Sequence, residues 1–143
     1  MALFFERRYG CCYDRARLLE KTLFYFGFKI RRVALYSRDE FGLLGMLIPG
    51  VSSHATTEVL TTRGWMGVDS NEPFILVRTD GQPIGYHEIS AYKSSLKYAP
   101  EPSAFYSQNL IVIYGLYSRH GLSHGLKIPI PELSLPQFFK YNL

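Results

Sequence analysis

Apolar residues recur in the first part of the chain at alternating steps of four and three positions, which is the spacing of one helix face. These positions are Cys12, Ala16, Leu19, Leu23 and Phe26. Gly27 is suited to end such a helix, because glycine readily adopts the left-handed conformation found at helix ends. The pattern predicts a helix over residues 12–26, with Cys12 at its N-terminus and on its buried face.

β-Branched and aromatic residues dominate shorter segments later in the chain, and this composition predicts strands. The predicted strands are 28–37, 43–48, 53–62, 65–70 and 109–117, with a further strand inside 74–85. A turn at 63–64 is predicted to make a hairpin of the third and fourth of these strands. Turns are also predicted at 38–40 and 80–81, and residues 87–98 show a weak helical period. One helix followed mostly by antiparallel strands predicts the α+β class.

Three prolines between residues 129 and 136 mark the C-terminal part of the chain. Proline lacks a backbone N–H and restricts the residue before it, so the tail from about residue 127 is predicted to be extended rather than helical. With 143 residues the chain has the size of one ordinary domain, and we expect a single domain over 1–143.

Composition and charge mainly exclude classes of binding partner. An apolar content of 47%, with 11 Tyr and 10 Phe, suffices for a stable core. The net charge of +4 comes from scattered basic residues with no run of like charges, so we expect no nucleic-acid partner. No apolar run approaches the roughly 20 residues that span a bilayer, and Glu6 interrupts the apolar start. We therefore expect no membrane partner and a cytoplasmic localisation.

The chain's only two cysteines, Cys11 and Cys12, are adjacent at the predicted helix N-terminus. A helix N-terminus and a neighbouring histidine both favour a thiolate, and a carboxylate then holds the histidine in a reactive orientation. The strand over 53–62 carries His54, and the hairpin places Asp69 roughly opposite it on the next strand. The pattern therefore predicts a Cys12–His54–Asp69 triad.

Several motifs follow one another in the same order and spacing as in one known family. Residues 10–16 (GCCYDRA) match Gly-x-Cys-x-Asp/Glu-x-Ala at the start of a helix. The end of that helix and an Arg-rich strand are matched by 23–33 (LFYFGFKIRRV). The motif His-Ala-x-x-Glu-Val is matched by 54–59 (HATTEV), and Gly-Trp followed by an aspartate by 64–69 (GWMGVD). Over residues 10 to about 70 the chain resembles the transglutaminase-like superfamily of papain-like cysteine enzymes.

The resemblance implies a papain-like, transglutaminase-like fold, in which a central helix carries the nucleophile and packs on an antiparallel sheet. It implies that Cys12 is the nucleophile, His54 the general base and Asp69 the carboxylate that orients the histidine. Four further residues are expected at the substrate cleft: Tyr9, Cys11, Thr56 and Trp65. Within residues 1–9, Tyr9 is the only plausible side-chain donor for an oxyanion hole beside the Cys12 backbone N–H. The family usually has a tryptophan where Thr56 stands.

Two residues of the matched motifs each have two interpretations. Glu58 is expected either to pair with an arginine or to be a solvated strand residue. Trp65 is expected either to pack beneath the strand that carries His54 or to wall the substrate cleft.

The predicted function is thiol acyl chemistry on a peptide or a small amide or ester, by hydrolysis or acyl transfer, with no cofactor. One open alternative is a non-catalytic binding module of the same fold, in which the aromatic and proline-rich tail docks a protein partner or a second copy. The other is an acyltransferase similar to arylamine N-acetyltransferases, which would use acetyl-CoA. The Arg-Gly-Gly usual ahead of that family's cysteine is matched only in part by residues 8–10.

Two other patterns are rejected as sites. Residues 121–125 (GLSHG) match the G-x-S-x-G nucleophile elbow, but the prolines that follow exclude the helix it requires, and no histidine comes later. His120 and His124 have the i, i+4 spacing of a metal-binding pair, but the neighbouring glycines argue against a helix and no further Cys/His cluster exists. No metal site is predicted.

Overall fold

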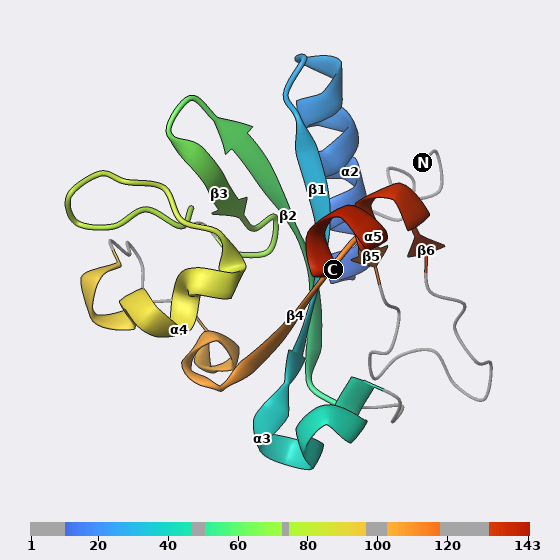
Figure 1. Ribbon diagram of the computed structural model, residues 1–143, viewed down its shortest axis with the longest axis vertical. Coiled ribbons are helices and arrows are strands. Elements are labelled where there is room, and N and C mark those ends of the chain that lie inside the picture. The colour runs from blue at the N-terminus through green and yellow to red at the C-terminus, as the bar shows by residue number, and fades with distance from the viewer. Residues whose placement is uncertain (1–10, 47–50, 73–74, 97–102, 118–131) are drawn as a thin grey trace.

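The computed structural model of the protein describes residues 11–46, 51–72, 75–96, 103–117 and 132–143 (Figure 1). Its centre is a curled, four-stranded antiparallel sheet in the order β3-β2-β1-β4. The strands are β1 (Ile30–Ser37), β2 (Ser53–Thr61), β3 (Gly64–Val68) and β4 (Leu110–Tyr114). A mixture of helices with an antiparallel sheet is consistent with the predicted α+β class.

Helix α2 (Cys12–Tyr25) covers one face of the sheet and packs against β2 (Figure 1). Its contact is close because small side chains meet there: Ala16 is buried against Ala55, beside the ring of Tyr13. Cys11 caps the helix, with its backbone N–H donating to the Asp14 carboxylate at 3.2 Å. After the helix, Gly27 has a φ of 82°, which favours glycine. The predicted helix and its glycine stop are confirmed.

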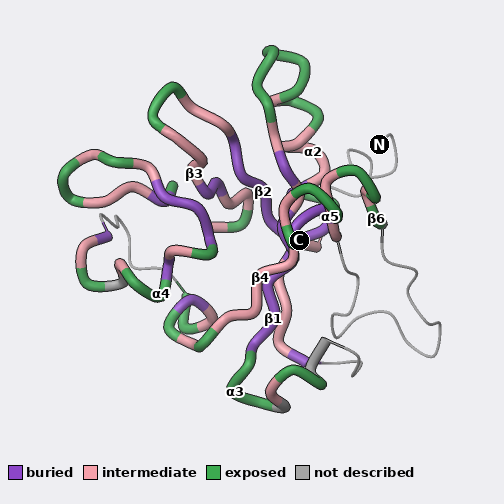
Figure 2. The backbone as a smooth tube through the Cα atoms, viewed as in Figure 1, coloured by how far each residue is buried: buried purple, intermediate pink, exposed green. Residues whose placement is uncertain are grey.

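The opposite face of the sheet carries the larger core cluster. Leu35 and Val33 of β1 pack there against side chains of the segment that follows β3, among them Leu76, Tyr86 and Ile89. That segment folds into three consecutive turns of helix: η2 (Tyr86–Glu88), α4 (Ile89–Tyr92) and η3 (Lys93–Ser95). Figure 2 shows the buried residues following β1 and β2 between these two layers.

The strand predicted at 43–48 is wrong for the part that the structure describes. Residues Arg38–Phe41 form helix α3, and Gly42–Met46 form the 3-10 helix η1. Leu43 and Leu44 are 61% and 65% exposed, so these two leucines are not part of the core. A short apolar run does not by itself distinguish a strand from a helical turn, and here the Ser37 hydroxyl accepts from the Asp39 N–H and starts a helix.

The prediction of an extended tail is wrong for residues 135–142, although 132–133 are extended. Residues Leu135–Asn142 form helix α5, with a proline in the first turn, where a missing backbone N–H costs no hydrogen bond. Two short strands, β5 (Leu116–Tyr117) and β6 (Glu132–Leu133), pair just before it. The Gln137 side chain accepts from the Arg32 N–H at 2.8 Å, and Asn142 bonds both backbone groups of Tyr114. Residues 118–131, including the rejected motifs at 120–125, lie outside the described residues.

An ion pair is buried at the centre of the sheet. The Arg31 Nε of β1 donates to Glu58 Oε2 of β2 at 2.6 Å, and both residues are buried. The Arg31 guanidinium lies over the rings of three aromatic residues at 3.9 to 4.8 Å: Trp65, Tyr114 and Tyr141. Of the two interpretations of Glu58, pairing with an arginine is confirmed.

Within the described residues, no helix is long and apolar enough to cross a bilayer.

We predict that Glu58→Gln lowers the free energy of unfolding by about 3–5 kcal/mol, because it leaves the Arg31 charge buried without a counter-ion. Urea unfolding followed by circular dichroism measures this. The control is Asp80→Asn, which breaks the exposed Arg78–Asp80 pair, and a change of no more than about 1 kcal/mol is expected there. Equal losses in the two variants would contradict a central role for the Arg31–Glu58 pair.

Candidate active site

The structure brings together Cys12, His54 and Asp69, the three residues predicted to form a triad. Cys12 is the first residue of α2, and His54 is the second residue of β2. Their side chains share a hydrogen bond, and the Cys12 sulfur also accepts from the Ala55 backbone N–H. The close packing of Ala16 on Ala55 sets this approach, because it holds the first turn of α2 on the start of β2.

Asp69 comes directly after β3 and contacts His54 from the neighbouring strand. The Nε2 of His54 lies 2.7 Å from Asp69 Oδ2, which leaves Nδ1 as the ring nitrogen that faces Cys12. The strand register pairs Thr57 with Val68, and continuing it by one pair sets Asp69 opposite Thr56, on the same face as His54. His54 and Asp69 are therefore diagonal neighbours beyond the end of β3, and they meet without a bulge in the hairpin.

Asp69 is held by further donors. Tyr106, from the 3-10 helix η4 (Ala104–Ser107), donates its hydroxyl to Asp69 Oδ2, and the Asn71 backbone N–H donates to Oδ1 at 2.8 Å. The side chain of Asp69 is 0% exposed and that of His54 is 12% exposed. Every interaction of this carboxylate therefore occurs in a site largely shielded from water.

Hydrogen bonds between hydroxyl groups extend from Tyr106 into the core. The Tyr106 ring stacks on the Tyr86 ring with centroids 6.2 Å apart, and the two hydroxyl groups share a hydrogen bond. The Tyr86 hydroxyl then lies 2.8 Å from the Thr56 hydroxyl, and Thr56 is fully buried. Thr56, which was expected at the cleft, supports the network behind Asp69 instead.

Tyr106 and Tyr86 were not predicted from the sequence. Both come from short helical turns in which no periodic pattern marks one tyrosine above the chain's others. The only available signal is the number of tyrosines, and it does not distinguish a core residue from one that contacts the site.

The hydrogen bonds shift the pKa values of all three residues toward the charged forms. Burial alone would lower the pKa of His54, but the bonds to Asp69 and Cys12 raise it to about 9. Burial alone would raise the pKa values of Cys12 and Asp69, but their bonds to His54 hold both below the ordinary values. The site therefore favours a thiolate and an imidazolium over a neutral thiol and imidazole.

The two adjacent cysteines differ in their chemistry. Burial raises the pKa of Cys11, whose sulfur donates to the Asp14 carboxylate at 3.3 Å. A neighbouring carboxylate disfavours a second negative charge, so Cys11 is held as a neutral thiol while Cys12 is activated. Both thiols are free.

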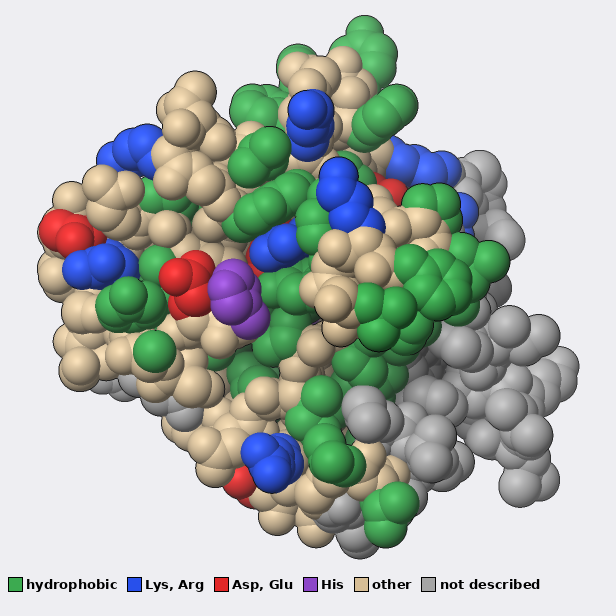
Figure 3. All heavy atoms as spheres, viewed as in Figure 1, with side chains coloured by type: hydrophobic (Ala, Val, Ile, Leu, Met, Phe, Trp, Pro, Cys, Tyr) green, Lys and Arg blue, Asp and Glu red, His purple; other side chains and the backbone are tan. Residues whose placement is uncertain are grey.

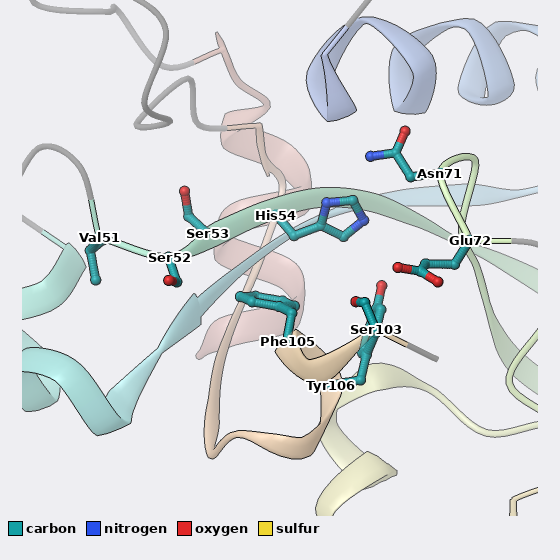
Figure 4. Close-up of a pocket in the computed structure, with 9 residues that line it drawn as sticks. All are labelled: Val51, Ser52, Ser53, His54, Asn71, Glu72, Ser103, Phe105 and Tyr106. Atoms are coloured by element: carbon teal, nitrogen blue, oxygen red, sulfur yellow. The ribbon is translucent and has the colours of Figure 1, made fainter. Parts of the chain in front are cut away.

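A cavity of about 340 Å³ opens beside His54 (Figure 4). It is lined from three parts of the chain: the start of β2, the loop after β3, and the start of η4. The nine lining residues are Val51, Ser52, Ser53, His54, Asn71, Glu72, Ser103, Phe105 and Tyr106.

Of the remaining expected cleft residues, Cys11 and Trp65 do not line this cavity. Trp65 packs on Arg31 and on the ring of Tyr141, with centroids 5.6 Å apart, so it belongs to the buried ion pair. Tyr9 lies outside the described residues. Among the described residues, no group of three or more His, Cys, Asp or Glu side chains is arranged to hold a metal ion.

Comparison of the chain with protein-family models, with curated proteins and with solved structures gives no significant match. The geometry of the site and the motifs in the sequence are therefore the basis for any functional inference.

We predict that Tyr106→Phe raises the pKa of His54 above its value of about 9. The variant removes one donor from Asp69, so the carboxylate concentrates more negative charge on the imidazolium, and a shift of up to about one pH unit is expected. Titration of the His54 ring proton by NMR, assigned with His54→Ala, measures it. Tyr92→Phe alters a tyrosine that packs under Arg78 and should leave the titration unchanged. A downward shift in Tyr106→Phe would contradict this role.

Proposed function

We propose that the protein is a cysteine enzyme that transfers acyl groups from a peptide or a small amide or ester through a covalent thioester on Cys12. The observation that supports the proposal best is the hydrogen-bonded series Cys12–His54–Asp69, with the pKa of the thiol lowered and that of the imidazole raised. Such a combination activates a cysteine nucleophile. The finer fold assignment, papain-like and transglutaminase-like, is part of this proposal.

In the first half of the reaction, the Cys12 thiolate attacks the substrate carbonyl carbon and forms a C–S bond. The carbonyl oxygen takes the negative charge in the tetrahedral intermediate. When the intermediate collapses, the C–N or C–O bond breaks, and the imidazolium of His54 gives its proton to the leaving group. Asp69 stabilises the imidazolium until that transfer and keeps Nδ1 directed at the sulfur.

In the second half, His54 accepts a proton from the incoming water or amine, which attacks the thioester carbonyl. The C–S bond breaks, and the sulfur leaves as the thiolate beside the imidazolium. Water yields hydrolysis and an amine yields acyl transfer, and no cofactor or metal is needed for either outcome.

The oxyanion of the tetrahedral intermediate needs preorganised donors. Cys12 opens α2, so its backbone N–H has no partner within the helix and points toward the end where charge develops. We assign this N–H as one donor of the oxyanion hole.

A non-catalytic binding role for the same domain has one observation in its favour. Aromatic side chains at the end of α2 and in the turn after it are exposed: Phe24 73%, Tyr25 84%, Phe26 69% and Phe28 46%. Figure 3 shows hydrophobic side chains gathered at this tip of the molecule. Exposed apolar groups of this kind are typical of contact surfaces, and thiol reactivity and acylation distinguish a binding role from a catalytic one.

Thiol reactivity tests the activated cysteine. We predict that the rate of iodoacetamide modification of Cys12 rises with an inflection well below the free-thiol value of about 8.5. The low inflection should persist in Cys11→Ser and disappear in Cys12→Ala, and in His54→Ala it should move upward. An inflection at or above the free-thiol value in the wild type would favour the binding module.

Turnover should follow a bell-shaped pH profile. We expect cleavage of amide substrates to rise as Cys12 ionises and to fall as the pH passes about 9, because His54 then lacks the proton that it gives to the leaving group. Iodoacetamide modification requires no such proton and should not fall at high pH. Parallel falls in both rates would indicate unfolding instead of loss of the acid.

The covalent intermediate can be observed directly. Intact mass after brief exposure to p-nitrophenyl acetate should show one acetyl group on the wild type and on Cys11→Ser, and none on Cys12→Ala. Acetyl-CoA in place of the ester tests the acetyltransferase alternative, which requires the same acetyl group on Cys12. Absence of acylation by every amide and ester donor tried, with a reactive thiol, would contradict the proposed enzyme.

A further inference from the structure

The cavity beside His54 contains one carboxylate that the proposed chemistry does not use. Glu72 lies in the loop that follows β3, three residues after Asp69. Figure 4 shows its side chain extending into the cavity, between His54 and Tyr106. Its position is therefore suited to a substrate contact.

The charge of Glu72 is not balanced within the described part of the chain. No other described residue forms an ion pair or a hydrogen bond with its carboxylate, whereas His54, the other charged group in the lining, is already paired with Asp69. A single-sign charge in a cavity with partly apolar walls attracts a counter-ion more strongly than the same charge on an open surface. Within the part of the chain that the structure describes, the negative charge of the cavity therefore has no counter-ion.

Part of the lining is apolar and suited to an aliphatic stem. Phe105 packs edge-on against the rings of both His54 and Tyr106, with centroids 5.9 and 5.6 Å apart, and so forms an aromatic wall. Val51 adds an apolar surface. Lysine and arginine side chains place an apolar stem before a charged head, and cations also bind favourably over aromatic faces.

We propose that this cavity is a specificity site for a cationic side chain of the acyl donor, an ammonium or guanidinium on an aliphatic stem, and that Glu72 is its counter-ion. The inference rests on the proposed acyl chemistry and adds the class of substrate. The cation belongs to the acyl donor and not to the attacking amine, because a carboxylate partner keeps an amine protonated and so without a nucleophilic lone pair. Glu72 is a specificity residue and takes no part in bond breaking.

The test compares coumarin amides of Nα-acetyl-lysine and Nα-acetyl-norleucine, which differ by the ammonium group. We expect the wild type to favour the lysine substrate by about tenfold in kcat/KM, a preference typical of one partly shielded ion pair. Glu72→Gln should lower kcat/KM for the lysine substrate about tenfold relative to the norleucine substrate and so abolish the preference. Glu72→Lys should reverse the preference. Asp80→Asn is the matched control, since it removes the same charge from an exposed residue that does not line the cavity, and it should retain the preference.

Equal rates for the two substrates in a wild type that turns both over would refute the cation site and leave the proposed function standing. A second measurement covers the case of no turnover. The rate at which Cys12 reacts is measured in a Cys11→Ser background with two reagents, the cationic trimethylammonium-ethyl methanethiosulfonate and the neutral methyl methanethiosulfonate. The quantity compared between variants is the ratio of the cationic rate to the neutral rate. A ratio that falls about tenfold in Glu72→Gln, but not in Asp80→Asn, supports the cation site even if the acyl chemistry fails. A ratio unchanged by Glu72→Gln overturns it.

Discussion

The buried pairing of Arg31 with Glu58 is the interaction on which the other parts of the structure converge. It joins β1 to β2 at the centre of the sheet, and the aromatic rings around the guanidinium come from β3, β4 and α5. Glu58 also accepts from the Tyr86 N–H at 2.6 Å. Because Tyr86 bonds Tyr106, which donates to Asp69, the ion pair is connected through hydrogen bonds to the candidate active site.

The candidate active site and the buried ion pair lie on the same face of β2. Every second residue of a strand points to the same face, and this face of β2 carries His54, Thr56 and Glu58. His54 contacts Asp69, Thr56 bonds the Tyr86 hydroxyl, and Glu58 pairs with Arg31. Cys12 reaches His54 from the other layer, over the part of β2 that extends beyond β3. The thiol and the carboxylate thus approach the same imidazole from two different sides of the sheet.

The sequence predicted well those features that depend on local periodicity. The helix over 12–26, the hairpin of β2 and β3, and the meeting of His54 with Asp69 all follow from spacing within a few dozen residues. It predicted poorly those that depend on tertiary partners. Tyr106 contacts Asp69 across 37 positions, and the residues next to Tyr106 in the sequence form no pattern that predicts this contact.

The wrong predictions have equally specific causes. The apolar run at 43–48 predicts a strand because its hydrophobicity is high, but Leu43 and Leu44 face solvent within a 3-10 turn. The prolines of the tail predict an extended chain because proline disfavours helices, yet a proline in the first turn of α5 is tolerated. In both segments, composition was a weaker guide than the position of a residue within its element.

The order of the chain has a consequence for biosynthesis. The hairpin that sets His54 beside Asp69 closes within about 16 residues, and α2 precedes it, so the three reactive groups leave the ribosome before Tyr106 and α5 do. Tyr106 follows later, and the bonds of Gln137 to β1 span 105 and 107 positions. Contacts of such long range form slowly and after local ones. A nascent chain therefore carries its thiol, imidazole and carboxylate before Tyr106 and α5, which bond Asp69 and β1, have been synthesised.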